Sequence, residues 1–206
     1  MTSGWSDRTS NGSDHRGPGK IAQLRAYWEA LRTGDDPPRR DRVDPRGLAE
    51  ALEHSFLIER IAPGIARFRI AGTAYNDLMG MDVRGMPLTC LFLGQSRDRL
   101  PLDLERVFRT PSILTLDLRA ETTLMRSSLS ARMQILPMLD QKGDATLAIG
   151  CVDLLGTIGR APRRFEITQG TQEPLNSGAP VQDHSTPTPP PPRATPGVPH
   201  LRLVKV

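Results

Sequence analysis

Two strand patterns that run directly into glycine-punctuated helical segments are the feature that most constrains this chain. The first strand is expected over residues 56–61, and the second, over residues 66–70, alternates apolar and basic side chains with a period of two. Pro63 and Gly64 lie between them and predict a hairpin turn. The segment therefore predicts two antiparallel strands with one apolar face.

The pattern changes directly after the second strand. Gly72 ends it, and a short helix is expected over residues 74–79, closed by Gly80. Both glycines are expected to adopt backbone angles that a side chain would resist. Pro87 is suited to open another helical turn over residues 89–92.

A longer helix and three further strands are expected downstream. Pro101 is predicted to begin the helix and Pro111 to end it, since a start at Ser96 would place Pro101 inside the helix. Alternating apolar residues predict strands over residues 114–118, 129–135 and 147–151. The sequence thus predicts an α+β fold with a five-stranded antiparallel sheet and helices on one face.

This order of elements resembles a PAS domain, and two motifs are similar to those of a bacterial family of PAS-like domains. The motifs lie in the segments YWEALRTGDDPPRRDRVDP and ARFRIAGTAYNDLMGMDVRG, and the resemblance covers residues 20–160. The matching residues are Trp28, Leu31, Arg32, Gly34, Pro38, Arg40, Asp44, Pro45, Arg67, Phe68, Arg69, Gly72, Thr73, Gly80 and Gly85. The resemblance implies a sensory or regulatory module.

An amphipathic helix is expected over residues 20–33, ahead of the sheet. Its apolar residues recur at three- and four-residue steps, and they are Ile21, Leu24, Tyr27, Trp28 and Leu31. The sheet face opposite the helices is expected to expose Leu57, Ile61, Ile65 and Leu136, a patch that needs a cover. The resemblance implies a homodimer through this helix, with Trp28 as an anchor. The alternative is that the helix covers its own sheet.

Composition divides the chain into a domain over residues 19–168 and two tails. Residues 1–18 are expected to be a disordered tail, and so are residues 169–206, because nine of the 19 prolines follow Thr171 and apolar residues are sparse. The second tail could bind a partner as a polyproline segment. A solvated tail is the favoured interpretation.

Charge and hydropathy narrow the class of partner. The formal charge of +4 permits nucleic-acid binding, but the arginines are scattered and no nucleic-acid motif is present, so this function is disfavoured. No apolar run approaches the roughly 20 residues of a membrane span, and the amino terminus lacks the apolar core of a signal peptide. A cytoplasmic protein is expected.

No catalytic or metal-binding pattern is found, so the chain is not expected to be an enzyme. The histidines are His15, His54, His184 and His200, and none lies near the long helix, where haem-binding PAS domains generally place their iron ligand. Cys90 lies in TCLFLGQ, which is similar to the flavin segment N-C-R-F-L-Q but lacks its asparagine and arginine. Haem and flavin are both disfavoured, and no cofactor is predicted.

A ligand pocket is expected between the sheet and its helices, with Tyr75 and Asn76 as the polar groups to watch. The expected lining residues are Phe68, Ile70, Tyr75, Asn76, Leu78, Met79, Leu88, Phe92, Leu104, Val107, Phe108, Leu116, Met133 and Ile149. The alternative is that these side chains fill the core. Two functions follow: a stand-alone sensory module that binds a small molecule or a signalling protein, or a scaffold with a filled core and a partner-binding tail.

The position of Glu59 depends on the length of the hairpin loop. A three-residue loop over residues 62–64 places Glu59 opposite Arg67 on the outer face, whereas a two-residue loop places it opposite Phe68 and turns it towards the pocket. The outer face is favoured, because an unpaired carboxylate in an apolar pocket carries a large desolvation cost.

Overall fold

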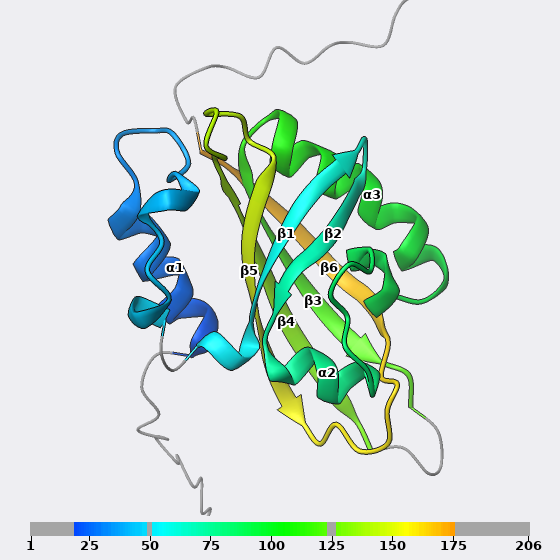
Figure 1. The fold of residues 1–206 in the computed structure, drawn as a ribbon. Coiled ribbons are helices and arrows are strands. Elements are labelled where there is room, and N and C mark those ends of the chain that lie inside the picture. Colours follow the sequence, from blue (N-terminus) through cyan, green and yellow to red (C-terminus); the bar gives the residue numbers. More distant parts are fainter. Residues whose placement is uncertain (1–18, 49–50, 123–126, 176–206) are drawn as a thin grey trace, which may run out of the picture.

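The computed structural model describes residues 19–48, 51–122 and 127–175, and six strands of this part form one antiparallel sheet in the order β2-β1-β5-β4-β3-β6 (Figure 1). The strands are β1 (Ser55–Ala62), β2 (Ile65–Ala71), β3 (Ser112–Ala120), β4 (Leu129–Met138), β5 (Leu147–Gly156) and β6 (Phe165–Pro174). The helices are α1 (Lys20–Leu31), α2 (Thr73–Met79) and α3 (Gly94–Arg109), and the 3-10 helices are η1 (Arg40–Arg42), η2 (Pro45–Leu48), η3 (Leu52–His54) and η4 (Leu88–Leu91). The predicted α+β class is confirmed, with one strand more than expected.

Two apolar cores lie on opposite faces of the sheet. Helices α2 and α3 cover the inner face, and α1 lies against the outer face, as Figure 1 shows. The inner core contains three aromatic rings, Phe56, Phe68 and Tyr75, whose centroids lie 5.4 to 5.8 Å apart. The Tyr75 hydroxyl donates to the carbonyl of His54 at 2.8 Å, and burial raises its pKa well above the usual value. The inner core is therefore closely packed.

Helix α1 covers its own sheet, which is the alternative to the predicted dimer contact. Leu24 and Trp28 are buried, and the Trp28 Nε1 donates to the carbonyl of Pro137 in β4 at 2.9 Å. In this arrangement the indole of Trp28 is only 1% exposed and packs within its own chain, and its role as the anchor of a second copy stays a prediction. The homodimer itself stays a prediction. Of the expected outer patch, Leu57 and Leu136 are buried beneath the amino-terminal elements, whereas Ile61 and Ile65 are exposed.

The β1–β2 hairpin contains a two-residue loop and two bulges. Ala62 pairs with Ile65, so Pro63 and Gly64 form the loop, yet Glu59 still lies opposite Arg67 as predicted. Ile61 is the extra residue in β1 that shifts the register by one position. Glu59 lies on the outer face and its carboxylate forms ion pairs with Arg67 at 3.1 Å and with Arg69 at 3.2 Å.

Helix α3 begins at Gly94, so the predicted start at Pro101 is wrong. Pro101 lies inside the helix, where it lacks the N–H that would bond to the preceding turn. The apolar stripe continues through this point, and Leu100, Leu104, Val107 and Phe108 are all buried in the inner core. Burial of that stripe outweighs the cost of an interior proline, which is about 3 kcal/mol.

Strand β6 extends the sheet beyond the boundary that composition indicated. The tail was expected to begin at residue 169, but β6 continues to Pro174 and pairs with β3 along its whole length. The predicted boundary is therefore wrong, and residues 1–18 and 176–206 of the expected tails lie outside the described part of the chain. No helix of the described ranges is long and apolar enough to cross a membrane.

Gly80 and Gly72 are both constrained, but for different reasons. Gly80 ends α2 with a φ of 71°, as expected for a left-handed helix cap. Gly72 has an ordinary φ of −70°, which corrects the prediction of unusual backbone angles there. A Cβ atom at Gly72 would overlap the backbone carbonyl of Glu53, so the close approach of η3 is what requires glycine.

Candidate ligand-binding cleft

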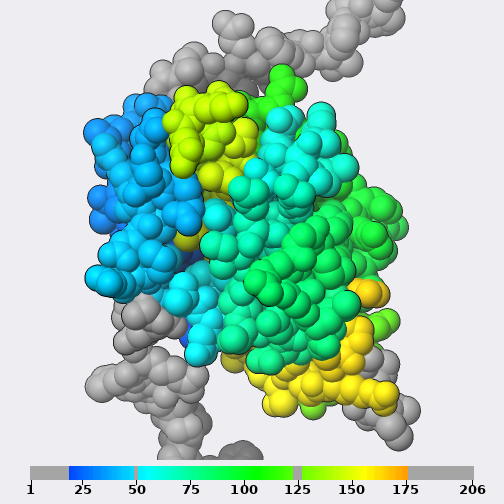
Figure 2. All heavy atoms as spheres, viewed as in Figure 1, coloured from blue at the N-terminus to red at the C-terminus, as the bar shows by residue number. Residues whose placement is uncertain are grey.

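An open apolar cleft lies on the outer face of the sheet, between strands β1 and β2 and the segment that joins α1 to β1. Its volume is about 350 Å³. Figure 2 shows the surface hollowed between this blue-to-cyan segment and the teal β2 strand. The lining residues are Arg40, Val43, Pro45, Leu48, Leu52, Glu53, Ser55, Phe56, Leu57, Ile70, Ala71, Gly72, Thr73, Met138 and Ile149.

The segment that joins α1 to β1 forms the roof of the cleft. Backbone and side-chain contacts hold this roof in place. The Arg40 N–H donates to the Leu139 carbonyl at 2.9 Å, which ties η1 to the end of β4. Asp44 caps η2, because its carboxylate accepts from the N–H of Arg46 at 2.9 Å. The Tyr27 hydroxyl bridges α1 to Asp44, since it accepts from the Asp44 N–H and donates to the Asp44 carbonyl. The segment is thereby fixed above the sheet.

The floor of the cleft is formed by side chains of four strands, β1, β2, β5 and the end of β4. Leu57 on β1 pairs with Ile70 on β2 and with Ile149 on β5. Ile70 remains 51% exposed and Leu52 in the roof 45% exposed, because both face the open cleft. These two side chains are apolar surface that a bound molecule would cover.

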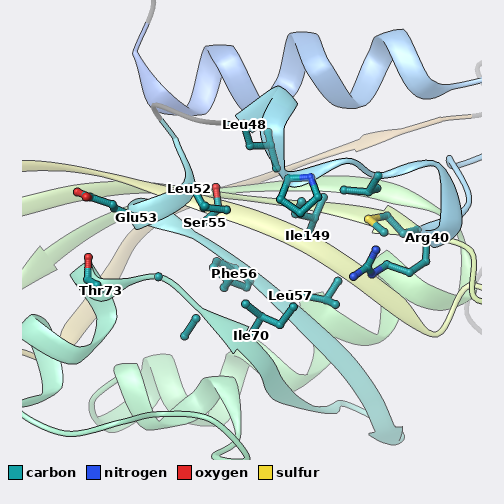
Figure 3. Close-up of a pocket in the computed structure, with 15 residues that line it drawn as sticks. Arg40, Leu48, Leu52, Glu53, Ser55, Phe56, Leu57, Ile70, Thr73 and Ile149 are labelled. Atoms are coloured by element: carbon teal, nitrogen blue, oxygen red, sulfur yellow. The ribbon is translucent and has the colours of Figure 1, made fainter.

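The two ends of the cleft differ in charge. Figure 3 shows Arg40 at one end and Glu53 and Thr73 at the other, with the apolar side chains of Leu57 and Ile70 between them. Arg40 is half-buried, and its guanidinium has no ion-pair or hydrogen-bond partner among the described residues. An unpaired, half-buried cation at the end of an apolar cleft favours an anion as its partner.

A second, more polar cavity of about 480 Å³ adjoins the cleft and shares Arg40, Leu57 and Ile70 with it. Its two carboxylates already have partners. Glu59 is paired with the arginines of β2. Asp140 accepts from the Thr146 hydroxyl at 2.8 Å and from backbone N–H groups of its loop, and these bonds lower its pKa.

His54 lies next to the cleft and bonds to α1. The Lys20 Nζ donates to the His54 Nε2 at 2.6 Å, which requires a neutral imidazole. Burial lowers the pKa of His54, and the charge of Lys20 lowers it further. This pair connects α1 to the start of β1.

The predicted pocket residues form the inner core, with three exceptions. Asn76 is exposed at the surface of α2, and Ile70 and Ile149 lie on the outer face, where they line the cleft. The other predicted residues are brought together by α2, η4, α3 and the sheet, and each is at most 5% exposed.

Two physical features explain why Ile70 and Ile149 lie on the outer face and not in the inner core. Arg69 is unpaired in β2, and this second bulge turns Ile70 away from the face that Phe68 occupies. Strand β5 is buried on both faces, with Ala148 and Val152 in the inner core and Ile149 in the outer one, so its apolar pattern does not distinguish the two faces.

The pocket predicted from the sequence did not include the residues that form the roof of the cleft. Arg40, Val43, Leu48 and Leu52 stand in a segment that reads as a polar connector and a short helix. Arg40 and Asp44 appear in the family motif, and that motif was the available signal for this region.

Neither cysteine has the properties of a reactive thiol. Burial raises the pKa of the Cys90 thiol, and it raises the pKa of Cys151 to about 12. Reactive thiolates instead have a lowered pKa. Within the described ranges, no group of three histidine, cysteine or acidic side chains is placed to hold a metal ion.

The elements and their order define a small α+β domain with one antiparallel sheet, and comparison with known families identifies its family. The family model of the PAS domain matches residues 18–153, so the chain belongs to the PAS domain family. No curated protein matches the sequence.

Two solved structures with a similar fold are the light and dark states of the blue-light photoreceptor Aureochrome1 LOV. The light-state structure is 11% identical, with a TM-score of 0.37 over 53% of this chain and 87% of that one. The dark-state structure is 12% identical, with a TM-score of 0.38 over 60% of this chain and 88% of that one.

Proposed function

We propose that this chain is a sensory or regulatory PAS module that acts by binding and not by catalysis, and that its ligand site is the outer-face cleft. The observation that carries the proposal is the half-buried guanidinium of Arg40, which lies at the end of an open apolar cleft and has no partner within the part of the chain that the structure describes. Ligand sites combine an apolar lining with a few fixed polar groups, and 350 Å³ lies within their usual range of about 300–1,000 Å³.

The position of the cleft would couple ligand binding to the binding of a protein partner. A bound molecule would contact the roof, which η1, η2 and η3 form, and the floor, which β1 and β2 form. The roof is joined to α1 through Tyr27, Asp44 and the Lys20–His54 bond. Binding would stabilise one position of α1 on the sheet, and a signalling partner that contacts α1 would respond to that change.

The test compares the full-length protein with two variants of the exposed strand β2. Purified protein is incubated with a small-molecule extract of cells, desalted under native conditions and weighed by native mass spectrometry. We expect an adduct on the wild type, its loss in Ile70→Trp, which fills the cleft, and its retention in Ile65→Trp. Ile65 is a matched control because it is also half-exposed on β2 but does not line the cleft. A bare mass for the wild type would refute the proposal.

The filled inner core favours a second candidate, a module that binds another protein without a small-molecule ligand. The residues of that core leave little exposed surface. The proline-rich segment that this candidate would use lies outside the described residues. A bare wild-type mass in the same experiment, together with a protein partner whose binding Ile70→Trp leaves unchanged, would favour it.

A further inference from the structure

We infer that the outer-face cleft binds an amphipathic anion, a carboxylate on an unbranched apolar chain of medium length, with its head group on Arg40. This inference rests on the proposed function for the location of the site and adds the chemical class of the ligand. The apolar chain would lie along Leu57 and Ile70, towards Thr73.

The charges around Arg40 support an anion from outside the described fold. The two carboxylates that line the adjoining cavity bond elsewhere, since Glu59 pairs with Arg67 and Arg69 and Asp140 accepts from groups of its own loop. The side chain of Lys142 also lines that cavity and has no partner among the described residues. An anionic group at this end therefore meets uncompensated positive charge, and a guanidinium binds a carboxylate through two parallel hydrogen bonds.

The remaining surface of the cleft supports an apolar chain. Between Arg40 and the end that carries Glu53 and Thr73 the lining is mostly apolar, with Ile70 and Leu52 about half exposed. A small inorganic anion would leave these side chains in water, and a neutral hydrocarbon would leave Arg40 unpaired. A single molecule with an anionic head group and an apolar chain would pair with Arg40 and also cover the exposed apolar side chains.

The opposite end of the cleft determines the orientation of the bound molecule. Glu53 carries a negative charge there, and Thr73 offers a hydroxyl group. A carboxylate at that end would be repelled by Glu53, whereas the methyl end of a chain would not. The cleft volume of about 350 Å³ is near the lower limit of ligand sites, which suits a chain of medium length.

The experiment measures binding of decanoate to the full-length protein by isothermal titration calorimetry, with decanoate kept below the concentration at which it forms micelles. The matched ligand is 1-decanol, which has the same chain without the charge. Loss of a hydrogen bond to a charged group weakens binding by about tenfold or more. We therefore expect decanol to bind the wild type at least about tenfold more weakly than decanoate does.

Three variants locate the binding. Arg40→Gln should weaken decanoate binding by about tenfold or more and remove the preference for decanoate over decanol. Arg46→Gln removes the same charge from η2, outside the cleft, and should leave the affinity unchanged. Ile70→Trp should abolish binding of both ligands, because the indole occupies the space of the chain.

The outcomes separate this inference from the proposed function. Decanol binding as tightly as decanoate, with no effect of Arg40→Gln, would overturn the anionic class but leave the cleft as a ligand site. Decanoate binding that Ile70→Trp does not reduce would place the anion elsewhere and overturn the inference. Absence of decanoate binding would overturn it too, while an Ile70-dependent adduct from the extract would preserve the proposed function. Arg40-dependent binding to phosphatidylglycerol vesicles without binding of free decanoate would assign the anion to a lipid surface and also overturn it.

Discussion

Replacement of Trp28 by alanine tests whether α1 covers its own sheet or joins two copies. The indole is 1% exposed and its Nε1 donates to the Pro137 carbonyl at 2.9 Å. The guanidinium groups of Arg25 and Arg32 lie 5.8 and 5.2 Å from the ring centroid. All these contacts lie within one chain, so their loss should lower the stability of the monomer.

The magnitude follows from burial. A buried tryptophan replaced by alanine costs about 3–5 kcal/mol, and this loss is large compared with the roughly 5–15 kcal/mol that separates a folded domain from its unfolded state. Trp28→Phe keeps most of the apolar contact but removes the indole N–H, which leaves the Pro137 carbonyl without that donor and costs about 1–3 kcal/mol. The two variants should therefore differ measurably.

Urea unfolding followed by far-ultraviolet circular dichroism measures both variants at a low and at a much higher protein concentration. If α1 covers its own sheet, the loss of unfolding free energy is the same at both concentrations, since unfolding of a monomer does not depend on dilution. A loss below about 1 kcal/mol for Trp28→Ala would contradict the packing argument. A loss that is larger at the higher concentration and shrinks on dilution would instead show that Trp28 holds two copies together, because dilution dissociates the wild-type dimer and removes the stability that the variant lacks.

The remaining predictions concern backbone geometry and pH. Gly72→Val and Gly80→Val should each lower the unfolding free energy by about 1–3 kcal/mol, the first by overlap with the Glu53 carbonyl and the second by strain at positive φ; unchanged thermal stability in both would contradict this. The pKa of His54 is lower in the folded protein than in the unfolded chain, so the unfolded chain binds a proton more readily. The neutral His54 side chain therefore contributes stability above the unfolded pKa of about 6.5, and this contribution declines as the pH falls through that value. Between about pH 7.5 and 5.5 the wild type should lose more stability than His54→Gln, which cannot titrate; identical slopes would show that His54 does not titrate with a lowered pKa.

The fold could be predicted because its strongest local signals agree with its packing. The strand over residues 66–70, the Pro63-Gly64 turn and the glycine cap of α2 all appear where they were expected. Strand β6 could not be predicted in the same way, since its residues are mostly polar and half of them face water. Backbone pairing with β3 holds such an edge strand, and this pairing leaves little trace in composition.

The hairpin shows why the face of a side chain is harder to predict than the strand that carries it. Ile61 and Arg69 are each an extra residue in one strand, and the two bulges shift the register in opposite directions. Glu59 lies between them and keeps the predicted partner Arg67, whereas Ile70 lies beyond the second bulge and changes face. A single inserted residue reverses every following side chain, because the period of a strand is two.

The cleft depends on that reversal, and of the predicted pocket residues only Ile70 and Ile149 line it. Without the bulge at Arg69, Ile70 would join Phe68 in the inner core, and the floor of the cleft would lose the side chain beside Leu57. The roof in turn depends on Arg40 and Leu139, which lie far apart in the sequence and meet through one backbone hydrogen bond. A cleft assembled from a bulge and a long-range hydrogen bond has no periodic pattern in the sequence, so it forms only when the whole chain is folded.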